Sequence, residues 1–392
     1  MKQAPSLARA RWLKEPGLQR IFAVIAEAGG EARVAGGAVR NALLGVPIAD
    51  IDVAVTLPPK RVAEVCEAAG FAVHPTGIDH GTVTVVALNK PYEVTTLRRD
   101  VETDGRRARV EFHDDWEKDA RRRDFTMNAL YCDARGKITD FTDGYRDILR
   151  KRIIFVGNPA ERIREDYLRI LRFFRFHARF GKGAPDKQGL AACRRLAKGI
   201  DGLSAERIRQ EMLKLLEAPR AIPTFKVMAR ENILKRILPY TEDWRVLERL
   251  PADGVLRLAV LAAEPRTLAH RLRLSNVEAK RISRLLSATP PKPSLRPREQ
   301  RMILYHLRPE TWRDAVHLAW ARSRAPLTDP AWKRLLRLPD RWAIPELPVD
   351  GRDLIAHGLA PGPLIGETLN RLEDWWIASD FKPTRGELLA LI

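Results

Sequence analysis

The chain has 392 residues, of which 45% are hydrophobic and 30% charged, and this is enough apolar material for two to four globular domains. Its longest apolar runs, such as residues 83–88, are far too short to span a bilayer, its first residues have no apolar signal-peptide core, and its three cysteines lie far apart. We therefore expect a soluble, cytoplasmic protein with no membrane-spanning segment. Lys and Arg number 69 against 50 Asp and Glu, and the net charge of +19 favours a polyanionic partner such as nucleic acid, although heavy use of Arg for solubility gives the same balance.

Short strands and helices alternate over the first 150 residues or so. Some predicted strands are joined by hairpin-length links and others by helices, which indicates a mixed sheet with helices packed against it, an α+β arrangement. The predicted strands are residues 32–35, 51–55, 83–88, 92–97 and 130–133, and the predicted helices are residues 38–44 and 59–69.

The pattern changes near residue 152. From residue 158 onward apolar residues recur at three- and four-residue spacing, as in Leu168, Leu171 and Phe174, which is typical of amphipathic helices. The C-terminal two thirds should therefore be nearly all helical. Segments that contain helix-breaking prolines predict joints between domains or subdomains at residues 218–219, 289–297 and 345–351.

Two glycines, Gly36 and Gly37, stand between the first predicted strand and the helix that follows it. Such a turn lets backbone N–H groups approach phosphate oxygens, while the helix dipole and Arg40 add positive character. Taken alone, a Gly-Gly pair is more often an ordinary tight turn.

Three carboxylates follow this turn. Asp50 and Asp52 stand at the head of the second predicted strand, where alternation directs both side chains to one face, and Glu93 lies within another strand-like run. Mg²⁺ prefers a couple of carboxylates and completes its coordination with water and substrate phosphates. Two ions held by three carboxylates suffice for nucleotidyl transfer. The alternatives are a solvated strand edge for Asp50 and Asp52 and an outward-facing position for Glu93.

Five motifs in a fixed order carry a resemblance to a known family. They are Gly-Gly-x-x-Arg with Asp-x-Asp, Arg-Arg-Asp-Phe-Thr-Met-Asn-Ala, Asp-Phe-Thr-Asp-Gly, Glu-Asp-Tyr-Leu-Arg-Ile-Leu-Arg and Ser-Ala-Glu-Arg-Ile, at residues 36–52, 122–129, 140–144, 165–172 and 204–208. Together they resemble the polymerase-β nucleotidyltransferase superfamily, and specifically the bacterial class II CCA-adding enzyme and poly(A) polymerase family. The resemblance covers residues 34–216 and extends more weakly to the C-terminus. Asn41 is a departure, because the family commonly carries Asp there.

The resemblance implies a fold and a division of the chain. We expect an α+β head that is a polymerase-β-like nucleotidyltransferase palm, followed by an all-α neck, body and tail. The head would span residues 1–152, a nucleotide-selecting neck 153–217, a helical body 218–300 and a tRNA-binding tail 301–392.

The same resemblance implies a template-independent enzyme that adds C, C and A from CTP and ATP to the 3′ end of tRNA and releases pyrophosphate, with two Mg²⁺ ions. No protein partner is implied. A poly(A) polymerase, or an enzyme that adds only CC or only A, shares these motifs and stays open as an alternative. A non-catalytic RNA-binding protein is a more remote one.

Site residues can be assigned on this basis. Asp50, Asp52 and Glu93 are the expected catalytic residues, with Asp50 and Asp52 on metal. The expected nucleotide-binding residues are Gly36, Gly37, Arg40, Arg123, Asp124, Asn128, Asp166, Arg169 and Arg172.

Selection of C and A can also be argued from hydrogen bonding. On a helix, Asp166 and Arg169 share a face at i and i+3, and Arg172 continues it. The carboxylate can then accept from the exocyclic amino group that cytosine and adenine share, while Arg169 donates to the adjacent ring nitrogen. Uracil and guanine reverse this order of donor and acceptor. An ordinary helical ion pair is the alternative.

Two further segments carry expectations. Residues 98–116 are rich in Arg and Asp without an apolar pattern, which predicts a mobile loop, and by resemblance this matches the loop used in switching from C to A addition. Six tryptophans of the last segment are expected in the core rather than on stacking platforms. A basic helical face, which either tracks tRNA phosphates or is simply solvated, is formed by Arg271, Arg273, Lys280, Arg281 and Arg284.

Overall fold

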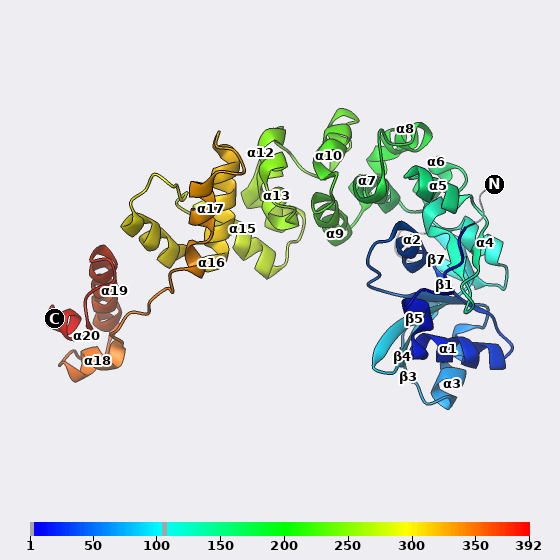
Figure 1. Cartoon of the computed structure of the whole chain (residues 1–392), viewed down its shortest axis with the longest axis horizontal. Coiled ribbons are helices and arrows are strands. Elements are labelled where there is room, and N and C mark those ends of the chain that lie inside the picture. The colour runs from blue at the N-terminus through cyan, green and yellow to red at the C-terminus, as the bar shows by residue number, and fades with distance from the viewer. Residues whose placement is uncertain (1–3, 104–107) are drawn as a thin grey trace. The chain divides into compact units, whose positions relative to one another are not determined.

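The computed structural model describes residues 4–103 and 108–392, and the chain forms two compact units, Met1–Leu238 (unit 1) and Pro239–Ile392 (unit 2). All strands of the described residues lie in unit 1, whereas unit 2 is built from helices (Figure 1). Across these residues, no helix combines the length and apolar character needed to cross a bilayer. The finer domain borders at residues 152, 217 and 300 remain predictions.

A seven-stranded mixed sheet forms the centre of unit 1, in the order β3-β4-β5-β2-β1-β8-β9. β2 and β5 are parallel, and the other neighbouring pairs are antiparallel. The strands are β1 (Ala32–Ala35), β2 (Asp52–Val55), β3 (Ala72–Gly77), β4 (Thr82–Ala87), β5 (Lys90–Thr96), β8 (Leu130–Cys132) and β9 (Ile138–Asp140). The mixed sheet and all five predicted strands are confirmed, whereas β3 and β9 were not predicted.

One face of this sheet is apolar and covered. Alternate residues of β4, including Val83 and Val85, are buried on that face. Helices α1 (Pro16–Glu27) and α3 (Pro59–Ala68) pack against it (Figure 1). Because successive side chains of a strand point to opposite faces, Asp52 and Glu93 project from the other side.

Residues 98–116 were predicted to be a mobile loop, but the described part of this segment has regular secondary structure. β6 (Arg98–Thr103) and β7 (Ala108–Phe112) pair as a separate antiparallel ribbon, and α4 (Trp116–Arg121) follows. The segment that forms β6 has a single apolar residue in the sequence and gives no strand signal, whereas the run that forms β7 alternates apolar and charged residues, a strand signal that the prediction overlooked. Gly105 lies outside the described residues.

The remaining helices of unit 1 confirm the predicted helical character beyond residue 152. A chain of aromatic rings joins α7 to the part that carries the sheet, since Phe155 lies 4.9 Å from Phe125 and 5.4 Å from Phe173, centroid to centroid. The helices beyond residue 152 are α6 (Pro159–Glu165), α7 (Leu168–Phe180), α8 (Lys187–Leu196), α9 (Ala205–Leu216), α10 (Ala221–Arg230) and α11 (Leu234–Ile237), and α2 (Gly37–Leu44) and α5 (Gly144–Arg150) precede them.

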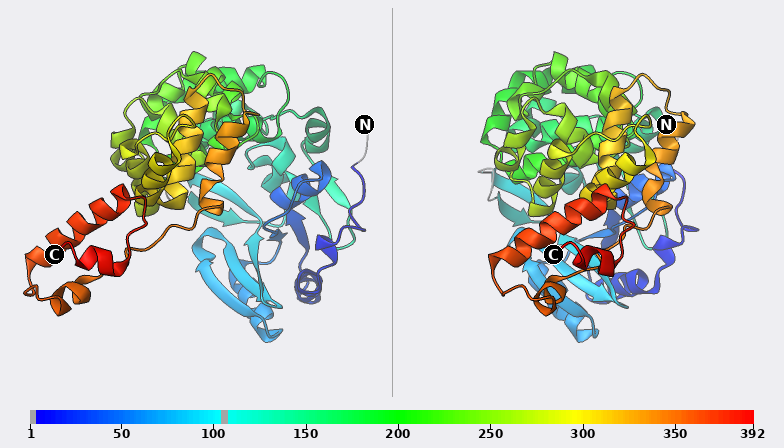
Figure 2. Two further views of the ribbon diagram at one scale, coloured as in Figure 1. Left: turned by 60° about the vertical axis from the view of Figure 1, so that its left-hand side comes forward. Right: turned by 90° about the vertical axis from the view of Figure 1, so that its left-hand side faces the viewer.

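Unit 2 consists of helices. Its elements are α12 (Trp244–Arg249), α13 (Gly254–Leu261), α14 (Leu268–Arg271), α15 (Asn276–Ser287), α16 (Pro297–Arg322), α17 (Pro330–Leu336), α18 (Gly351–Ala356), α19 (Pro363–Ala378) and α20 (Arg385–Leu389). α16 is broken at Arg308, where φ is 61°, immediately before Pro309. The last three helices, orange to red in Figure 2, share a small core around Leu372 and Trp376.

The tryptophans of unit 2 are mostly core residues, as predicted. Trp312, Trp320, Trp332 and Trp376 are buried, and the rings of Trp320 and Trp332 stack with centroids 6.0 Å apart. The prediction was wrong for Trp375, which is 41% exposed. Its neighbours Trp376 and Ile377 take the inward positions on α19, and the turn of the helix directs Trp375 away from that core.

Candidate active site

A row of side chains crosses the face of the sheet opposite α1 and α3, and α4 covers part of this face through Trp116 and Ala120. In-register pairing places Glu93 of β5 beside Asp52 of β2, Asp52 beside Ala35 of β1, and Ala35 beside Tyr131 of β8. Residues paired across strands point to the same side, so the two carboxylates and the tyrosine share one face. The sheet therefore brings together residues that are far apart in the sequence.

Asp50 joins this row from outside the strand. β2 begins at Asp52, not at residue 51, so strand alternation does not fix the direction of Asp50. The pKa of Asp52 is nevertheless raised, first by its partial removal from water and then by the negative charges of Glu93 and Asp50, while Arg123 opposes this. The three carboxylates and Arg123 thus act on one another at one site.

The carboxylates suit a divalent cation. In the described part of the chain, no three His, Cys, Asp or Glu side chains gather tightly enough to form a metal site by themselves. Mg²⁺ does not require such a cage, because it retains several waters and takes phosphate oxygens from its substrate. A carboxylate such as Asp52, whose pKa is raised by burial and by neighbouring negative charge, is a donor that a cation would stabilise. Asp50 and Asp52 therefore fit a metal site completed by substrate.

The Gly-Gly turn lies at the end of the same row. Gly36 has φ 65° and ψ −110°, a conformation that favours glycine, and Gly37 begins α2. A Cβ on Gly36 would lie 3.1 Å from Nη1 of Arg123 and 3.3 Å from the carbonyl oxygen of Asn128. The absent side chain thus leaves room for the guanidinium beside the N-terminus of α2.

A continuous hydrogen-bond chain runs from α2 to α7. Arg40 Nη1 donates to Oδ1 of Asn128 (2.5 Å), and Asn128 Nδ2 donates to Oδ1 of Asp124 (2.9 Å). Asp124 Oδ2 accepts from Nε of Arg172 at 2.8 Å. Four predicted nucleotide-binding residues are therefore joined into one network, in which Arg172 comes from α7.

Asn41 orients Arg40. Its Oδ1 accepts from Nε (3.1 Å) and Nη2 (2.9 Å) of Arg40, and its Nδ2 donates to the carbonyl oxygen of Pro47. A carboxylate could make the first two contacts but not the third, because it has no N–H. The departure at this position thus ties Arg40 to the segment that leads to Asp50.

Positive charge gathers around Phe176 of α7. The guanidinium carbons of Arg40, Arg172 and Arg175 lie 5.2, 5.4 and 4.6 Å from its ring centroid. The pKa of Arg40 is lowered to about 10, first by burial, and Arg175 and Arg172 add to the effect against the opposing charge of Asp124. Such a cluster favours an anionic ligand.

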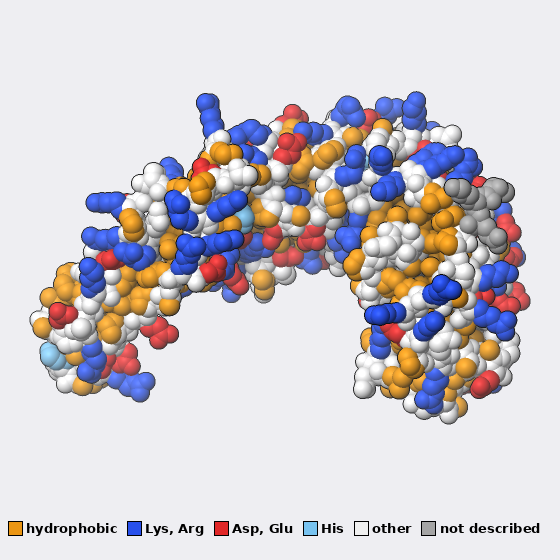
Figure 3. Space-filling view, in the orientation of Figure 1, with side chains coloured by type: hydrophobic (Ala, Val, Ile, Leu, Met, Phe, Trp, Pro, Cys, Tyr) orange, Lys and Arg blue, Asp and Glu red, His pale blue; other side chains and the backbone are white. Residues whose placement is uncertain are grey.

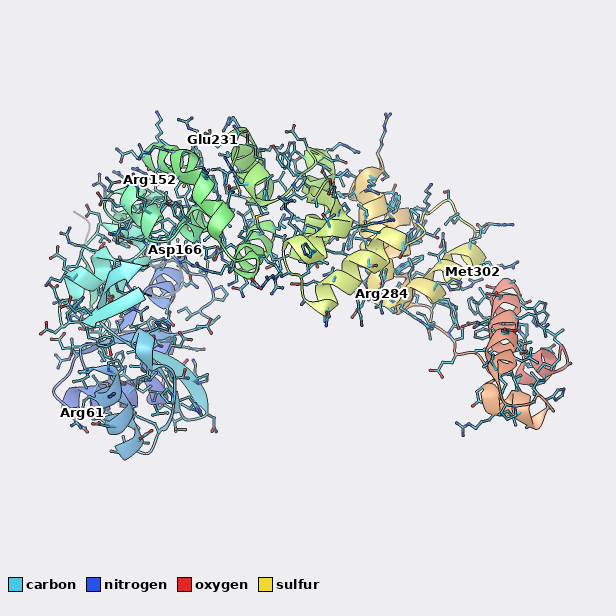
Figure 4. All side chains as sticks on the ribbon, turned by 180° about the vertical axis from the view of Figure 1, so that it is seen from behind. Arg61, Arg152, Asp166, Glu231, Arg284 and Met302 are labelled. Carbon is cyan, nitrogen blue, oxygen red and sulfur yellow. The ribbon has the colours of Figure 1, made fainter. Side chains whose placement is uncertain are left out.

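The predicted base-selecting residues are close together, but not as one helical face. Asp166 is an extended residue between α6 and α7, so its predicted place on the helix was wrong (Figure 4). Its Oδ1 accepts from the backbone N–H of Leu168, and its Oδ2 accepts from Arg207 Nη2 at 2.7 Å. Arg169 lies on α7 and bonds to Glu165 at 2.6 Å.

The basic residues predicted for tRNA lie in unit 2, where Lys and Arg side chains are spread over the visible surface (Figure 3). Lys280 and Arg284 are exposed on α15, and Arg271 and Arg273 are exposed just before it. Arg281 differs, because it bonds to Asp314 through Nε (2.7 Å) and to Asp253 through Nη2 (2.7 Å).

Two residues that contact the predicted site residues were not predicted from the sequence. Arg207, which holds Asp166, lies within the fifth motif but was not singled out. Asp119, four residues before Arg123, accepts hydrogen bonds from Arg122, Arg123 and Tyr131 and is 1% exposed. An Asp–Arg pair at i and i+4 is a visible signal, but it normally indicates a surface ion pair.

Two protein-family models match the chain. A model described as "Poly A polymerase head domain" matches residues 32–154, and one described as "Probable RNA and SrmB- binding site of polymerase A" matches residues 184–245. The first covers the sheet and the row of carboxylates.

Full-length relatives extend the likeness over nearly the whole chain. The mitochondrial CCA tRNA nucleotidyltransferase 1 of Mus musculus is 34% identical over 96% of this chain and 89% of its own length, and the CCA-adding enzyme of Bacillus cytotoxicus is 30% identical over 90% and 92%. A crystal structure of the Bacillus stearothermophilus CCA-adding enzyme in complex with CTP superposes with a TM-score of 0.79 at 29% identity, covering 96% of this chain and 97% of that one. By sequence over almost its full length, as well as by fold, the chain belongs to the family of CCA-adding enzymes, the CCA tRNA nucleotidyltransferases.

Proposed function

We propose that this protein adds C, C and A from CTP and ATP to the 3′ end of tRNA, with release of pyrophosphate. The observation that carries the proposal is the row on the sheet, in which Asp52 and Glu93 are in-register neighbours beside Arg123 and the Gly36 turn. The names of the relatives and the CTP bound to the Bacillus stearothermophilus enzyme support this reaction. Three buried free thiols suit the reducing cytoplasm.

In this proposal the carboxylates serve the reacting atoms. Asp50 and Asp52 hold Mg²⁺, and Glu93 lies next to Asp52 on the adjacent strand. Divalent ions at such a site supply charge stabilisation for the attacking 3′-hydroxyl and for the pyrophosphate that leaves. The in-register pairing of β2 and β5 keeps the carboxylates fixed relative to each other during the transfer.

The cations and the turn serve the triphosphate. Gly36 and Gly37 open the N-terminus of α2, where backbone N–H groups and the helix dipole attract phosphate oxygens. Arg123 and Arg40 add positive charge at the same end. Asp124 and Asn128, fixed by Arg172 and Arg40, present a polar edge to the sugar.

Asp166 and Arg169 retain capacity for a base. A carboxylate has about four acceptor positions, and the contacts with Leu168 and Arg207 occupy two of those of Asp166. Arg169 has five N–H donors, of which three are used by Glu165 and by the carbonyl oxygens of Arg162 and Arg122. The remaining groups can accept from an exocyclic amino group and donate to a ring nitrogen, the pattern common to cytosine and adenine.

The test is extension of tRNA that lacks its 3′ end, with each NTP in turn and then with CTP and ATP together. We expect C, then C, then A, and no product with UTP or GTP. Long A tracts would instead indicate a poly(A) polymerase, and a product that stops after CC or begins only at A would indicate a partial enzyme.

A double substitution tests the role of the two aspartates. Asp50→Ala with Asp52→Ala should abolish incorporation and leave tRNA binding intact, because both residues serve the transfer and not the RNA backbone. Retained incorporation would remove the metal assignment. No incorporation by the unmodified protein with any NTP would favour a non-catalytic RNA-binding role.

A further inference from the structure

Arg123 is held by a buried clamp that none of the five motif assignments includes. Asp119 of α4 is 1% exposed, and Tyr131 of β8 is fully buried. Asp119 Oδ2 accepts from Nη2 of Arg123 at 3.0 Å and from the Tyr131 hydroxyl at 2.6 Å. The hydroxyl oxygen in turn accepts from Nε of Arg123 at 3.1 Å. The three side chains close a small ring of hydrogen bonds.

This ring leaves one end of the guanidinium directed at the nucleotide site. Nε and Nη2 of Arg123 are engaged by Asp119 and Tyr131, whereas Nη1 lies against the Gly36 turn, 3.1 Å from where a Cβ would stand. The Tyr131 ring adds a cation–π contact, with the guanidinium carbon 5.1 Å from its centroid. Tyr131 belongs to the same sheet row as Asp52 and Glu93.

We propose that Asp119 and Tyr131 are positioning residues that aim Nη1 of Arg123 at the triphosphate of the incoming nucleotide. The inference rests on the proposed function for the identity of that nucleotide. A flexible arginine loses rotamer freedom when it binds an anion, and a guanidinium already fixed on two nitrogens has little left to lose.

Electrostatics suit this role. Burial alone would raise the pKa of Asp119, but the charges of Arg123 and Arg122 outweigh it and hold the pKa well below its usual value. Asp119 therefore stays ionised at neutral pH. A permanently charged, buried carboxylate with several donors is a fixed support for a cation.

Tyr131→Phe tests the clamp with the smallest change, because it removes one hydroxyl and keeps the ring. Its matched control is Tyr92→Phe. Tyr92 is likewise buried in the same sheet, its hydroxyl donates to a carboxylate, Glu15, at 3.0 Å, and it lies on the opposite face. Both variants lose a tyrosine–carboxylate bond, but only one touches Arg123.

We expect Tyr131→Phe to weaken equilibrium binding of CTP, measured by calorimetry, by about tenfold, and to raise KM for CTP and ATP equally. The rate constant kcat and KM for tRNA should change less than about twofold. Tyr92→Phe should leave nucleotide binding unchanged at a similar loss of thermal stability. Equal CTP affinity in the two variants would overturn the clamp, whether or not the unmodified protein extends tRNA.

A double-mutant cycle asks whether Tyr131 acts through Arg123. In an Arg123→Lys background, whose single ammonium cannot span both partners, Tyr131→Phe should add less than about twofold to the loss of CTP affinity. Fully additive losses would show that Tyr131 acts elsewhere and would overturn the inference. Asp119→Asn is a second probe, expected to weaken CTP binding at least as much as Tyr131→Phe.

Discussion

Gly36 and Gly45 flank helix α2 with nearly equal backbone φ angles, 65° and 66°, but in different surroundings. A Cβ at Gly36 would press on Arg123 Nη1, whereas a Cβ at Gly45 would meet nothing within 4 Å. Gly36→Ala should therefore lower kcat/KM for CTP by at least about tenfold. Gly45→Ala should cost only about 1 kcal/mol of stability, with activity unchanged. Steady-state kinetics and thermal unfolding of both variants check this, and equal losses of activity would contradict it.

His177 of α7 gives the stability of the protein a dependence on pH. It is 5% exposed, and burial, with a further contribution from Arg220, lowers its pKa from 6.5 to about 4. The unfolded chain therefore takes up this proton first as the pH falls. The stabilisation is complete above pH 6.5 and is lost as the pH falls toward 4, by roughly 3 kcal/mol at most.

His177→Gln should remove this contribution. Urea denaturation at pH 7, 5.5 and 4.5 should show a shallower loss of unfolding free energy for the variant than for the unmodified protein. Parallel curves would contradict the assignment to His177, because the remaining carboxylates titrate equally in both proteins.

A side chain could be singled out from the sequence where it belongs to a motif. It could not be singled out where its role depends on a contact with a residue far away in the sequence. Gly36, Arg40 and Asp52 could be singled out because their type and order were informative. Asp166 was placed wrongly, because it lies just before α7, where its side chain accepts from the backbone N–H of Leu168. Asp119 was not noticed, since its burial depends on Tyr131, a partner supplied by another strand.

Elements were predictable in proportion to their apolar pattern. β4 buries alternate apolar residues and α3 buries residues at helical spacing, and each was found close to its observed bounds. β9 is a three-residue strand without a fully buried side chain, and the segment of β6 has a single apolar residue, so neither has an apolar pattern, whereas the alternation in the segment of β7 was overlooked. A sequence pattern therefore reveals elements that bury apolar side chains at regular intervals, and it misses short strands that are defined only by pairing with a neighbouring strand.

Arg281 joins three helices of unit 2. It forms a two-pronged contact with Asp314 of α16, a residue 6% exposed, and it also bonds to Asp253, which caps the N-terminus of α13. Arg281→Met should leave the Asp314 carboxylate buried without its cation and destabilise unit 2 by about 2 kcal/mol. The exposed Arg284, on the same helix, is a matched control (Figure 4).

Thermal unfolding of the two variants separates these roles. Arg281→Met should lower Tm by several degrees, while Arg284→Met should leave Tm unchanged and weaken tRNA binding if α15 faces the RNA. A lower Tm for Arg284→Met than for Arg281→Met would contradict the assignment of Arg281 to the helix joint.

The whole molecule carries a net charge of +19, and this charge attracts a polyanion such as tRNA. Binding of tRNA should weaken by more than about tenfold between 50 and 200 mM salt, because each phosphate contact releases a counterion. Filter binding or fluorescence anisotropy over this range measures the slope. A flat dependence would contradict binding led by phosphates, and the same titration with CTP alone provides a comparison.

The in-register pair of Asp52 and Glu93 allows the connection between their strands to vary in length. Asp52 and Glu93 are neighbours because β2 and β5 run side by side in register, and the intervening α3, β3 and β4 merely return the chain to the start of β5. Lengthening or trimming that detour at its surface turns would not alter the separation of the two acidic groups. A search for related sites should therefore not require a fixed number of residues between the two acidic groups. Their proximity depends on the adjacency of the two strands and not on their spacing in the sequence.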